Sequence, residues 1–583
     1  MALIRAISIK NFRCIQKLEW LPNPEINCLV GPGDTGKSSV IDAIDFCIGA
    51  RRALQISDKD FYRMDVSKSI EISIVIGALE DNLKNFDSYG LYLRGFNLKT
   101  GELVEEPEKG LDTTLVVKLK IEDDLEPQWS LVSPRAEAQG QSRSLSWKDR
   151  LALSPTRLGA ATDQHLGWRK GSLLHKLSEE RADASGALTQ AARNVRISFG
   201  DQASQQLTKT LGIVLATATN LGVEIGDKAQ ALIDSAAISF NGGTVSLHDQ
   251  HNVPLSQLGL GSTRLLIAGL QREAAQNVSM ILIDELEHGL EPHRLIRLLD
   301  ALGAKTSPSK LQVFMTTHSP VVVRELSGDQ LMILRCVNEE HVVKPAGLND
   351  AVQGAIRTFP EALLAPKILV CEGASEVGLV RGLNQHRADI GERSLLANGV
   401  ALVDGGGDTA IGRALAFQIL GYRVALFLDN DLDGKADMRI KNAQMLKFKD
   451  AGGKIFIWRD GLALEDELFT SLPDSAVEHL LDFALERREE SVMNDQIKTK
   501  SGNAKTWNSV YSELLIEGKF SPDTRVILGR ASRHKESKKS WYKSLGAMEK
   551  VGKEIVGPDL DNAEQAFKDV ISAIFKWTSN ATS

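Results

Sequence analysis

The sequence predicts an α/β protein in which two domains follow one another, each built around a parallel sheet. Three observations lead to this prediction. A glycine-rich loop near the amino terminus lies between an apolar segment and a segment with helical spacing. Two later apolar segments end in polar residues, and the same strand–turn–helix pattern starts again after Pro366. Strands that alternate with helices in this way are typical of parallel sheets.

Composition and charge limit what the chain can be. With 583 residues, of which 43% are hydrophobic, the sequence is long enough for two or three domains. The formal net charge is -7, so a DNA-binding surface would have to be a local basic patch. No apolar run approaches the length that crosses a bilayer, and Arg5 and Lys10 interrupt the first apolar residues. We therefore expect a cytoplasmic protein without a membrane partner.

The glycine-rich loop fits the pattern G-x-x-x-x-G-K-[ST] in the context that this motif needs. It follows a predicted strand at Ile26–Val30 and precedes a predicted helix at residues 39–48. In such a loop the backbone N–H groups bind phosphates, while the lysine reaches the β/γ oxygens and the next hydroxyl binds Mg²⁺. The predicted nucleotide-binding residues are Gly31, Pro32, Gly33, Asp34, Thr35, Gly36, Lys37, Ser38 and Ser39.

Two further predicted strands end in groups that suit nucleotide chemistry. The apolar segment 279–283 is followed by Asp284, expected to hold Mg²⁺ through water, and by Glu285, expected to polarise the attacking water. The apolar segment 311–317 is followed by His318, at the strand end where ligands of open α/β sheets lie.

Together and in this order, these segments resemble the Walker B, D-loop and H-loop of an ABC-type ATPase. The resemblance implies ATP with one Mg²⁺, and a signature segment that contacts ATP held by the other subunit of a head-to-head homodimer. Gly261 and Ser262 are assigned to that segment, although the usual Leu-Ser-Gly-Gly-Gln string is absent. Residues 9–13 resemble the opening of SMC-like and DNA-repair ABC ATPases, whereas Gln55 and residues 57–60 remain open candidates for a Q-loop.

The two halves of the ATPase motif are far apart in the sequence. About 247 residues separate Lys37 from Asp284, which is more than a compact nucleotide domain needs. We expect the ATPase at residues 1–164 and 223–362, with a helical insertion at 165–222. A dimerisation element and a solvated helical decoration are both consistent with that insertion.

The second half of the chain carries different chemistry. Three predicted strands, at 367–371, 423–428 and 454–458, each lead to carboxylates. These carboxylates are Glu372, Glu376, Asp429, Asp431, Glu465 and Glu467. Gathered at one sheet edge they would repel one another, and Mg²⁺ or Mn²⁺ would neutralise them because both prefer oxygen ligands. An EF-hand is excluded, because a strand precedes Asp429 and the twelfth position is Ile440.

Glu-Gly on one strand and Asp-x-Asp on the next resemble a Toprim domain, here expected at residues 363–583. A split ABC ATPase followed by a Toprim domain resembles the OLD (overcoming lysogenization defect) family of nucleases. The resemblance implies DNA cleavage with two metal ions. It makes Glu372, Glu376, Asp429 and Asp431 metal ligands, with Glu465 or Glu467 completing the shell of the second ion.

The same resemblance implies a lysine that stabilises charge on the reacting phosphate. The segment from Arg530 to Lys553 is basic, and within it Lys543 is the first choice, with Lys539 and Lys538 as alternatives. Simple electrostatic contact with the DNA backbone explains these cations equally well.

The sequence thus favours an ATP-binding, divalent-metal-dependent DNA nuclease. Its expected catalytic residues are Lys543, Glu372, Asp429 and Asp431, with Glu285 for ATP hydrolysis. The alternative is an SMC-like DNA-binding ATPase whose Toprim domain is structural or needs a partner. A topoisomerase would need a tyrosine in a further domain, and a primase would need a zinc module that five scattered cysteines do not supply. The family resemblance also implies phage defence or processing of damaged DNA, beside a helicase-like partner.

Overall fold

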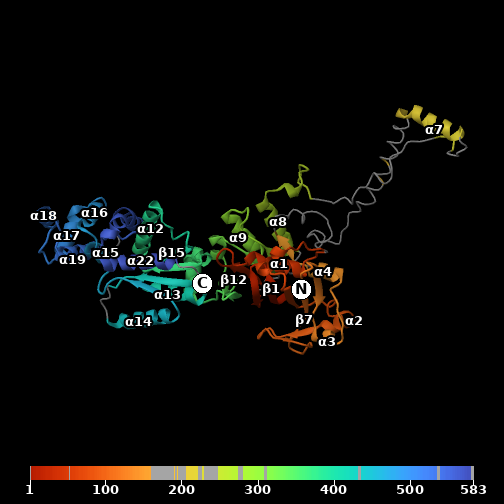
Figure 1. The fold of residues 1–583 in the computed structure, drawn as a ribbon, viewed down its shortest axis with the longest axis horizontal. Coiled ribbons are helices and arrows are strands. Elements are labelled where there is room, and N and C mark those ends of the chain that lie inside the picture. Colours follow the sequence, from red (N-terminus) through yellow and green to blue (C-terminus); the bar gives the residue numbers. More distant parts are fainter. Residues whose placement is uncertain are drawn as a thin grey trace.

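The computed structural model describes most of the chain (Figure 1). It covers residues 2–51, 53–158, 190, 194, 205–220, 226–228, 247–273, 280–306, 311–430, 435–534 and 539–579. Asp431, Lys538 and most of the insertion expected at 165–222 lie outside these residues. Of that insertion the structure describes mainly helix α7 (Thr208–Asn220). No helix in the described ranges combines the length and apolar character needed to span a bilayer.

The first sheet contains 13 strands among the described residues, and the strands towards one edge of it are parallel. These strands run in the order β12 (Leu331–Val337), β3 (Ile26–Val30), β11 (Gln312–Thr316), β10 (Met280–Ile283) and β9 (Thr156–Leu158), which is the edge strand. Neighbouring strands in this group are parallel, with Val313 opposite Ile26 and Ile281 opposite Val313. Their carboxyl ends therefore lie along one edge, where the glycine-rich loop, Asp284 and His318 follow.

The rest of the same sheet is antiparallel except at one strand pair. Its strands are β1 (Leu3–Phe12), β2 (Ile15–Trp20), β4 (Ile70–Gly77), β5 (Arg94–Phe96), β6 (Leu103–Val104), β7 (Asp112–Ile121), β8 (Pro127–Leu131) and β13 (Glu340–Pro345). Isoleucines at alternate positions of β4, from Ile70 to Ile76, are fully buried against helix α1 (Lys37–Ile48) and its neighbours. This period of two is the expected signature of a strand with one face on a core.

The second sheet is parallel throughout, as the sequence predicts. Its order is β15 (Val400–Asp404), β14 (Lys367–Cys371), β16 (Arg423–Leu428) and β17 (Lys454–Ile457). Alternate residues of β14 pack on opposite faces: Ile368 meets helices α13 (Ala410–Ile419) and α14 (Lys435–Asp450), and Leu369 meets α12 (Ala374–Asp389). Parallel sheets covered on both faces have this continuous apolar character.

The remaining helices follow β17 and pack on the α12 side of the second sheet. They are α15 (Leu464–Ser471), α16 (Asp474–Leu485), α17 (Glu490–Lys500), α18 (Trp507–Glu517), α19 (Pro522–Ser532), α20 (Leu545–Val551) and α22 (Gln565–Ser579). Together with α12 they bury a core that includes Trp458, Trp541 and Phe567. Figure 1 shows this helical layer beside the second sheet, with the first sheet on the opposite side of the molecule.

The two sheets share one hydrophobic core. A single buried cluster contains Leu331 from the first sheet, Ile356 from helix α11 (Asp350–Thr358) and Ile368 from the second sheet. The guanidinium of Arg335 lies 3.6 Å from the ring centre of Tyr422, whose hydroxyl donates to the carbonyl of Leu363 at 2.5 Å. The connecting turn at Pro360–Leu364 is itself largely buried, so the chain passes between the sheets without an exposed linker.

Two glycines set a close approach between α12 and α20. A Cβ at Gly378 would lie 2.5 Å from the carbonyl oxygen of Leu545, and one at Gly382 would collide with the carbonyl oxygen of Glu549. We call Gly378 and Gly382 the glycine seam. Because α12 carries Glu376 and Lys543 directly precedes α20, the glycine seam controls how near that lysine comes to that carboxylate.

Gly382→Ala is expected to destabilise the protein, because overpacking a close helix contact typically costs about 1–3 kcal/mol. The matched control is Gly412→Ala on α13, where a Cβ would meet nothing within 4 Å. A helical glycine in open space gains about 0.5–1 kcal/mol when it becomes alanine. Urea unfolding curves of both variants measure the difference, and equal midpoints would contradict the tight packing.

Candidate functional site

The glycine-rich loop wraps around the side chain of Lys37. Its Nζ donates to the carbonyl oxygens of Gly31 at 3.0 Å and Pro32 at 2.6 Å. The loop needs positive φ at Gly36 (φ 85), where a Cβ would also lie 2.8 Å from the Sγ of Cys14. Burial lowers the pKa of Lys37, while Asp34 and Asp284 oppose that shift. The lysine therefore sits inside the ring of N–H groups that would receive phosphates.

Asp284 bonds directly to the start of helix α1. Its Oδ1 accepts from the hydroxyl of Ser38 at 3.0 Å and from the hydroxyl of Thr316 at 2.6 Å. The carboxylate of Asp284 and the hydroxyls of Ser38 and Thr316 thus lie together at the carboxyl edge of the sheet. A Mg²⁺ site beside nucleotide phosphates requires such a group of oxygen ligands. Thr316 belongs to the strand that the sequence predicts at 311–317. The sequence does not distinguish its hydroxyl, as a partner of Asp284, from the side chains of the other strand residues.

The residues after Asp284 form a polar turn of defined geometry. Glu285 has φ 48 and a half-exposed side chain, and its N–H donates to the Thr316 hydroxyl at 2.8 Å. Glu287 accepts from the hydroxyl of Thr317 at 2.7 Å and from the N–H of His318 at 2.6 Å. Glu285 is thus open to the nucleotide edge, while Glu287 fixes the loop that carries His318.

The segment assigned as a signature lies against this turn. A Cβ at Gly261 would lie 2.7 Å from the carbonyl oxygen of Gly289, and Ser262 accepts from Arg294 at 3.2 Å. In the same helix, α8 (Leu260–Glu273), the buried Arg264 donates to the carbonyl oxygens of Glu285 at 3.2 Å and His288 at 2.8 Å. Helix α8 therefore holds the backbone of the acidic turn.

Ion pairs connect the amino-terminal turn and β9 to helix α1, which follows the glycine-rich loop. Arg13 pairs with Asp42 on α1 and with Asp60, at 2.9 Å for the second contact. Arg157 in the middle of β9 pairs with the same Asp42 and with Asp45. Two arginines from distant segments thereby fix the helix whose amino terminus faces the phosphates.

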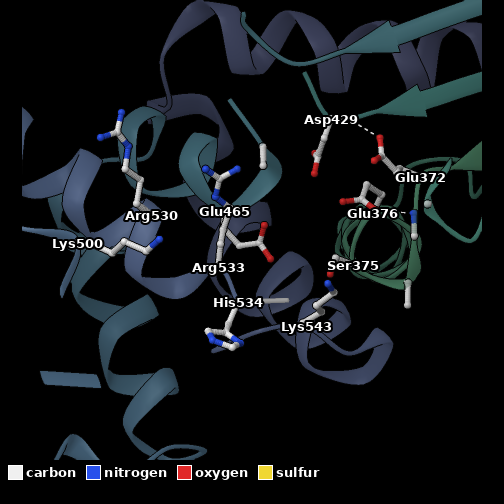
Figure 2. A pocket seen from close by; sticks show the side chains of 14 residues that line it. Glu372, Ser375, Glu376, Asp429, Glu465, Lys500, Arg530, Arg533, His534 and Lys543 are labelled. Atoms are coloured by element: carbon white, nitrogen blue, oxygen red, sulfur yellow. Dashed lines mark hydrogen bonds between the residues drawn. The ribbon is translucent and has the colours of Figure 1, made fainter. Parts of the chain in front are cut away.

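The second domain has a pocket of about 750 Å³ at the carboxyl edge of its sheet. Figure 2 shows Glu372, Glu376 and Asp429 on one side of it, with Glu465 facing them. Its lining also includes five basic residues: Lys500, Arg530, Arg533, His534 and Lys543. Carboxylates from three strand ends and cations from the carboxy-terminal helices thus meet in one cavity.

Backbone N–H groups hold the carboxylates in place. Glu372 accepts from the N–H of Asp429 at 2.9 Å, Asp429 accepts from the N–H of Leu464 at 3.0 Å, and Glu376 accepts from that of Gly373 at 2.7 Å. Glu372 and Asp429 are thus each held by a different element of the domain, whereas Glu376 is held by the amino-terminal cap of its own helix α12. Asp431, the second acid after β16, lies outside the described residues.

A comparison with known protein families identifies the first domain. Residues 26–324 match the model of the family described as "AAA domain, putative AbiEii toxin, Type IV TA system". The chain belongs to this family. The match begins at β3 and includes the glycine-rich loop, Asp284 and His318, so the phosphate-binding edge of the first sheet is that of an AAA domain.

A comparison with curated proteins finds a relative whose similarity is not confined to the AAA domain. It is 23% identical over 451 residues to the "OLD nuclease" of Thermus scotoductus (strain ATCC 700910 / SA-01), covering 70% of this chain and 78% of that protein. Seventy per cent of 583 residues exceeds the 366 residues that precede β14, so the similarity reaches into the second domain. The resemblance expected from the sequence is thus confirmed.

Solved structures give a weaker likeness. An SMC head bound to the C-winged helix domain of ScpA has 17% identity and a TM-score of 0.34, covering 60% of this chain and 99% of that one. The SMC head domain from Thermotoga maritima has 14% identity and a TM-score of 0.29, covering 59% of this chain and 100% of that one. The recombination mediator RecF has 11% identity and a TM-score of 0.29, covering 59% and 98%.

Burial is the main influence on the pKa values of the carboxylates in the pocket of the second domain. Burial and, to a smaller extent, the carboxylates of Glu465 and Glu372 raise the pKa of Glu376 to about 8. Burial also raises the pKa of Glu465, while Arg533 and Lys543 lower it. The cations therefore partly compensate the burial of Glu465, whereas the carboxylates near Glu376 add to the effect of its burial.

The chemistry of these donors suits a divalent cation, although their spacing in this structure is wide. Within the described ranges, no three His, Cys, Asp or Glu side chains stand close enough together to hold a metal ion. The oxygen donors that face the pocket, Glu372, Glu376, Asp429 and Glu465, are hard ligands of the kind that Mg²⁺ and Mn²⁺ bind. Their mutual repulsion is what such an ion would relieve.

The other residues expected at this site lie in different places. Glu467 is 1% exposed and pairs with Arg459 at 2.7 Å, and it does not line the pocket. Lys543 lines the pocket, Lys539 does not, and Lys538 lies outside the described residues. Sequence reasoning did not single out Lys500, because no motif connects the end of α17 with the acidic strands.

Glu376→Gln is expected to raise the stability of the metal-free protein at pH 8, on the order of 3 kcal/mol. The pKa of Glu376 is about 8 in the folded chain and 4.5 when unperturbed, so the folded state binds the proton more tightly. Folding stability therefore falls as pH rises through this window, and glutamine removes that loss. The gain should be small at pH 5.

Thermal unfolding in the presence of a chelator measures this effect at both pH values. The exposed Glu517→Gln on α18 serves as the control and should show no such pH dependence. An equal gain at pH 5 and pH 8 would show that charge at Glu376 is not its source.

Proposed function

We propose that this chain is an ATP-binding, divalent-metal-dependent DNA nuclease whose second domain is a Toprim domain. The observation that carries the proposal is the pocket in which carboxylates from parallel strand ends face basic groups. The similarity to a protein named OLD nuclease, which extends past the AAA domain, supports it. An acidic cluster binds metal and a basic wall binds phosphate, and a phosphodiesterase needs both.

In this proposal Glu372, Glu376, Asp429, Asp431 and Glu465 hold two Mg²⁺ or Mn²⁺ ions. When bound, such ions activate a water and stabilise the departing oxygen of an in-line displacement. The chain's own contribution is positioning. Backbone N–H groups fix Glu372 and Asp429, and Lys543, which lines the same pocket beside Ser375, contacts the phosphate as its negative charge grows. In this proposal Glu467 supports α15 through Arg459 and binds no metal.

For the AAA domain, we propose ATP with one Mg²⁺ held by Ser38 and Asp284, and Glu285 as the residue that orients water. The proposal includes a homodimer in which Gly261 and Ser262 contact the partner's nucleotide. It divides the chain at the expected boundaries, with the nuclease at 363–583. A role in phage defence or processing of damaged DNA, beside a helicase-like partner, rests on the family resemblance.

The nuclease proposal is tested with supercoiled plasmid and Mg²⁺ or Mn²⁺. The wild type should nick or linearise the DNA, and Asp429→Ala should reduce the rate by about 10³-fold or more because one metal ligand is lost. The exposed Asp460→Ala, outside the pocket lining, is the matched control and should retain the wild-type rate. Intact DNA under both metals, with and without ATP, would instead favour a DNA-associated ATPase that needs a partner.

The ATP proposal is tested without any cleavage. Mg²⁺-ATP at about 100 times its dissociation constant should stabilise the wild type by about 2.7 kcal/mol. Lys37→Ala should lose this gain, because Lys37 is the cation inside the phosphate loop. The exposed Lys109→Ala should keep it. A nucleotide-dependent melting shift that survives in Lys37→Ala would place ATP elsewhere.

A further inference from the structure

The pocket of the second domain is divided by charge along its length. Figure 2 shows Lys500 and Arg530 on one side and Glu372, Glu376 and Asp429 on the other, with Glu465 and Arg533 between them. Because the charges are separated, the two sides of the pocket suit ligands of opposite charge. The acidic side suits cations, and the far side suits an anion.

The basic groups of the pocket differ in whether they already interact with an acidic side chain. Arg533 pairs with Asp466 at 3.2 Å, and both Arg533 and Lys543 act electrostatically on Glu465. The side chains of Lys500 and Arg530 are exposed and make no hydrogen bond or ion pair with another described residue. Their charges are therefore not used by the acids of the pocket.

Both residues stand on a packed platform. Lys500 ends α17 and Arg530 lies in the last turn of α19, and these two helices contact each other. Ile497 and Leu528 anchor the helices in the core, and Gly529 allows α19 to approach Asp466 so closely that a Cβ would lie 2.9 Å from its Oδ1. The two cations are thus held at a fixed place relative to the acids.

A cation near a helix carboxyl terminus also stabilises the helix itself. That effect explains why a basic residue is favourable at each position. It does not explain why two different helices direct their terminal cations into one pocket. Lys498 occupies the same last turn of α17 and does not line the pocket, so it separates the two explanations.

We propose that Lys500 and Arg530 form a subsite for a phosphate of the bound DNA strand other than the one being cut. This inference rests on the proposed nuclease function. The scissile phosphate would lie between the acids and Lys543, and the strand would continue along the pocket to the second phosphate. The substrate class is therefore a polynucleotide strand, and a diester without a neighbouring phosphate would lack this contact.

The first test measures binding without cleavage. The probe is a fluorescein-labelled duplex oligonucleotide, with Ca²⁺ replacing Mg²⁺ and NaCl varied. The double variant Lys500→Gln and Arg530→Gln should reduce the slope of log K against log[salt] by about one, as expected for one lost phosphate contact. Lys498→Gln removes a charge from the same turn of α17 outside the pocket lining and should keep the wild-type slope. An unchanged slope in the double variant overturns the proposal.

The second test compares two substrates of the same reaction in Mg²⁺. The double variant should lower the ratio of plasmid cleavage to bis(p-nitrophenyl) phosphate hydrolysis by about tenfold, because only the plasmid has a second phosphate. An equal fall for both substrates overturns the proposal, since the two cations would then act at the reacting phosphate or on the fold. If the wild type hydrolyses neither substrate, the proposed nuclease function fails, while the binding test still decides the subsite.

Discussion

Both candidate sites depend on parallel strands that end at the same edge of a sheet. In the AAA domain this register brings Ser38, Asp284 and Thr316 into one hydrogen-bonded group. In the second domain it brings Glu372 and Asp429 together from β14 and β16. The polar groups lie at these ends because the strands themselves are buried on both faces and carry apolar residues. Chemistry is thus confined to the strand ends and to whatever packs against them.

The strand ends are also what sequence reasoning could recognise. An apolar run followed by a glycine loop or a carboxylate is local in sequence, and so β3, β10, β11, β14 and β16 are found within a residue or two of where the patterns place them. Glu376 and Glu465 stand within a few residues of such ends and were identified for that reason. The parallel character of the second sheet follows from the alternation of strands and helices.

What could not be predicted depends on packing between distant segments. Arg264 holds the backbone of the acidic turn, and Arg335 lies on Tyr422 of the other sheet, but neither contact has a local sequence signal. The placement of Lys500 and Arg530, from the ends of α17 and α19, in one pocket likewise has no local sequence signal. Glu465 and Glu467 show the limit within one turn of helix: they are two residues apart, yet one faces the pocket and the other pairs with Arg459. Residues two apart on a helix point in different directions, and only the tertiary structure shows which of the two directions leads to the pocket.

The strand order of the first sheet has a consequence for the way the chain acquires its structure. β3, which precedes the phosphate loop, lies between β11 and β12, whose residues come nearly three hundred positions later. As the polypeptide leaves the ribosome, the amino-terminal hairpin of β1 and β2 can pair at once, while β3 waits until residue 337 or so has emerged. Contacts of such high sequence separation form slowly and leave apolar edges exposed meanwhile. The nucleotide loop therefore becomes competent to bind phosphate only after some three hundred further residues have been synthesised.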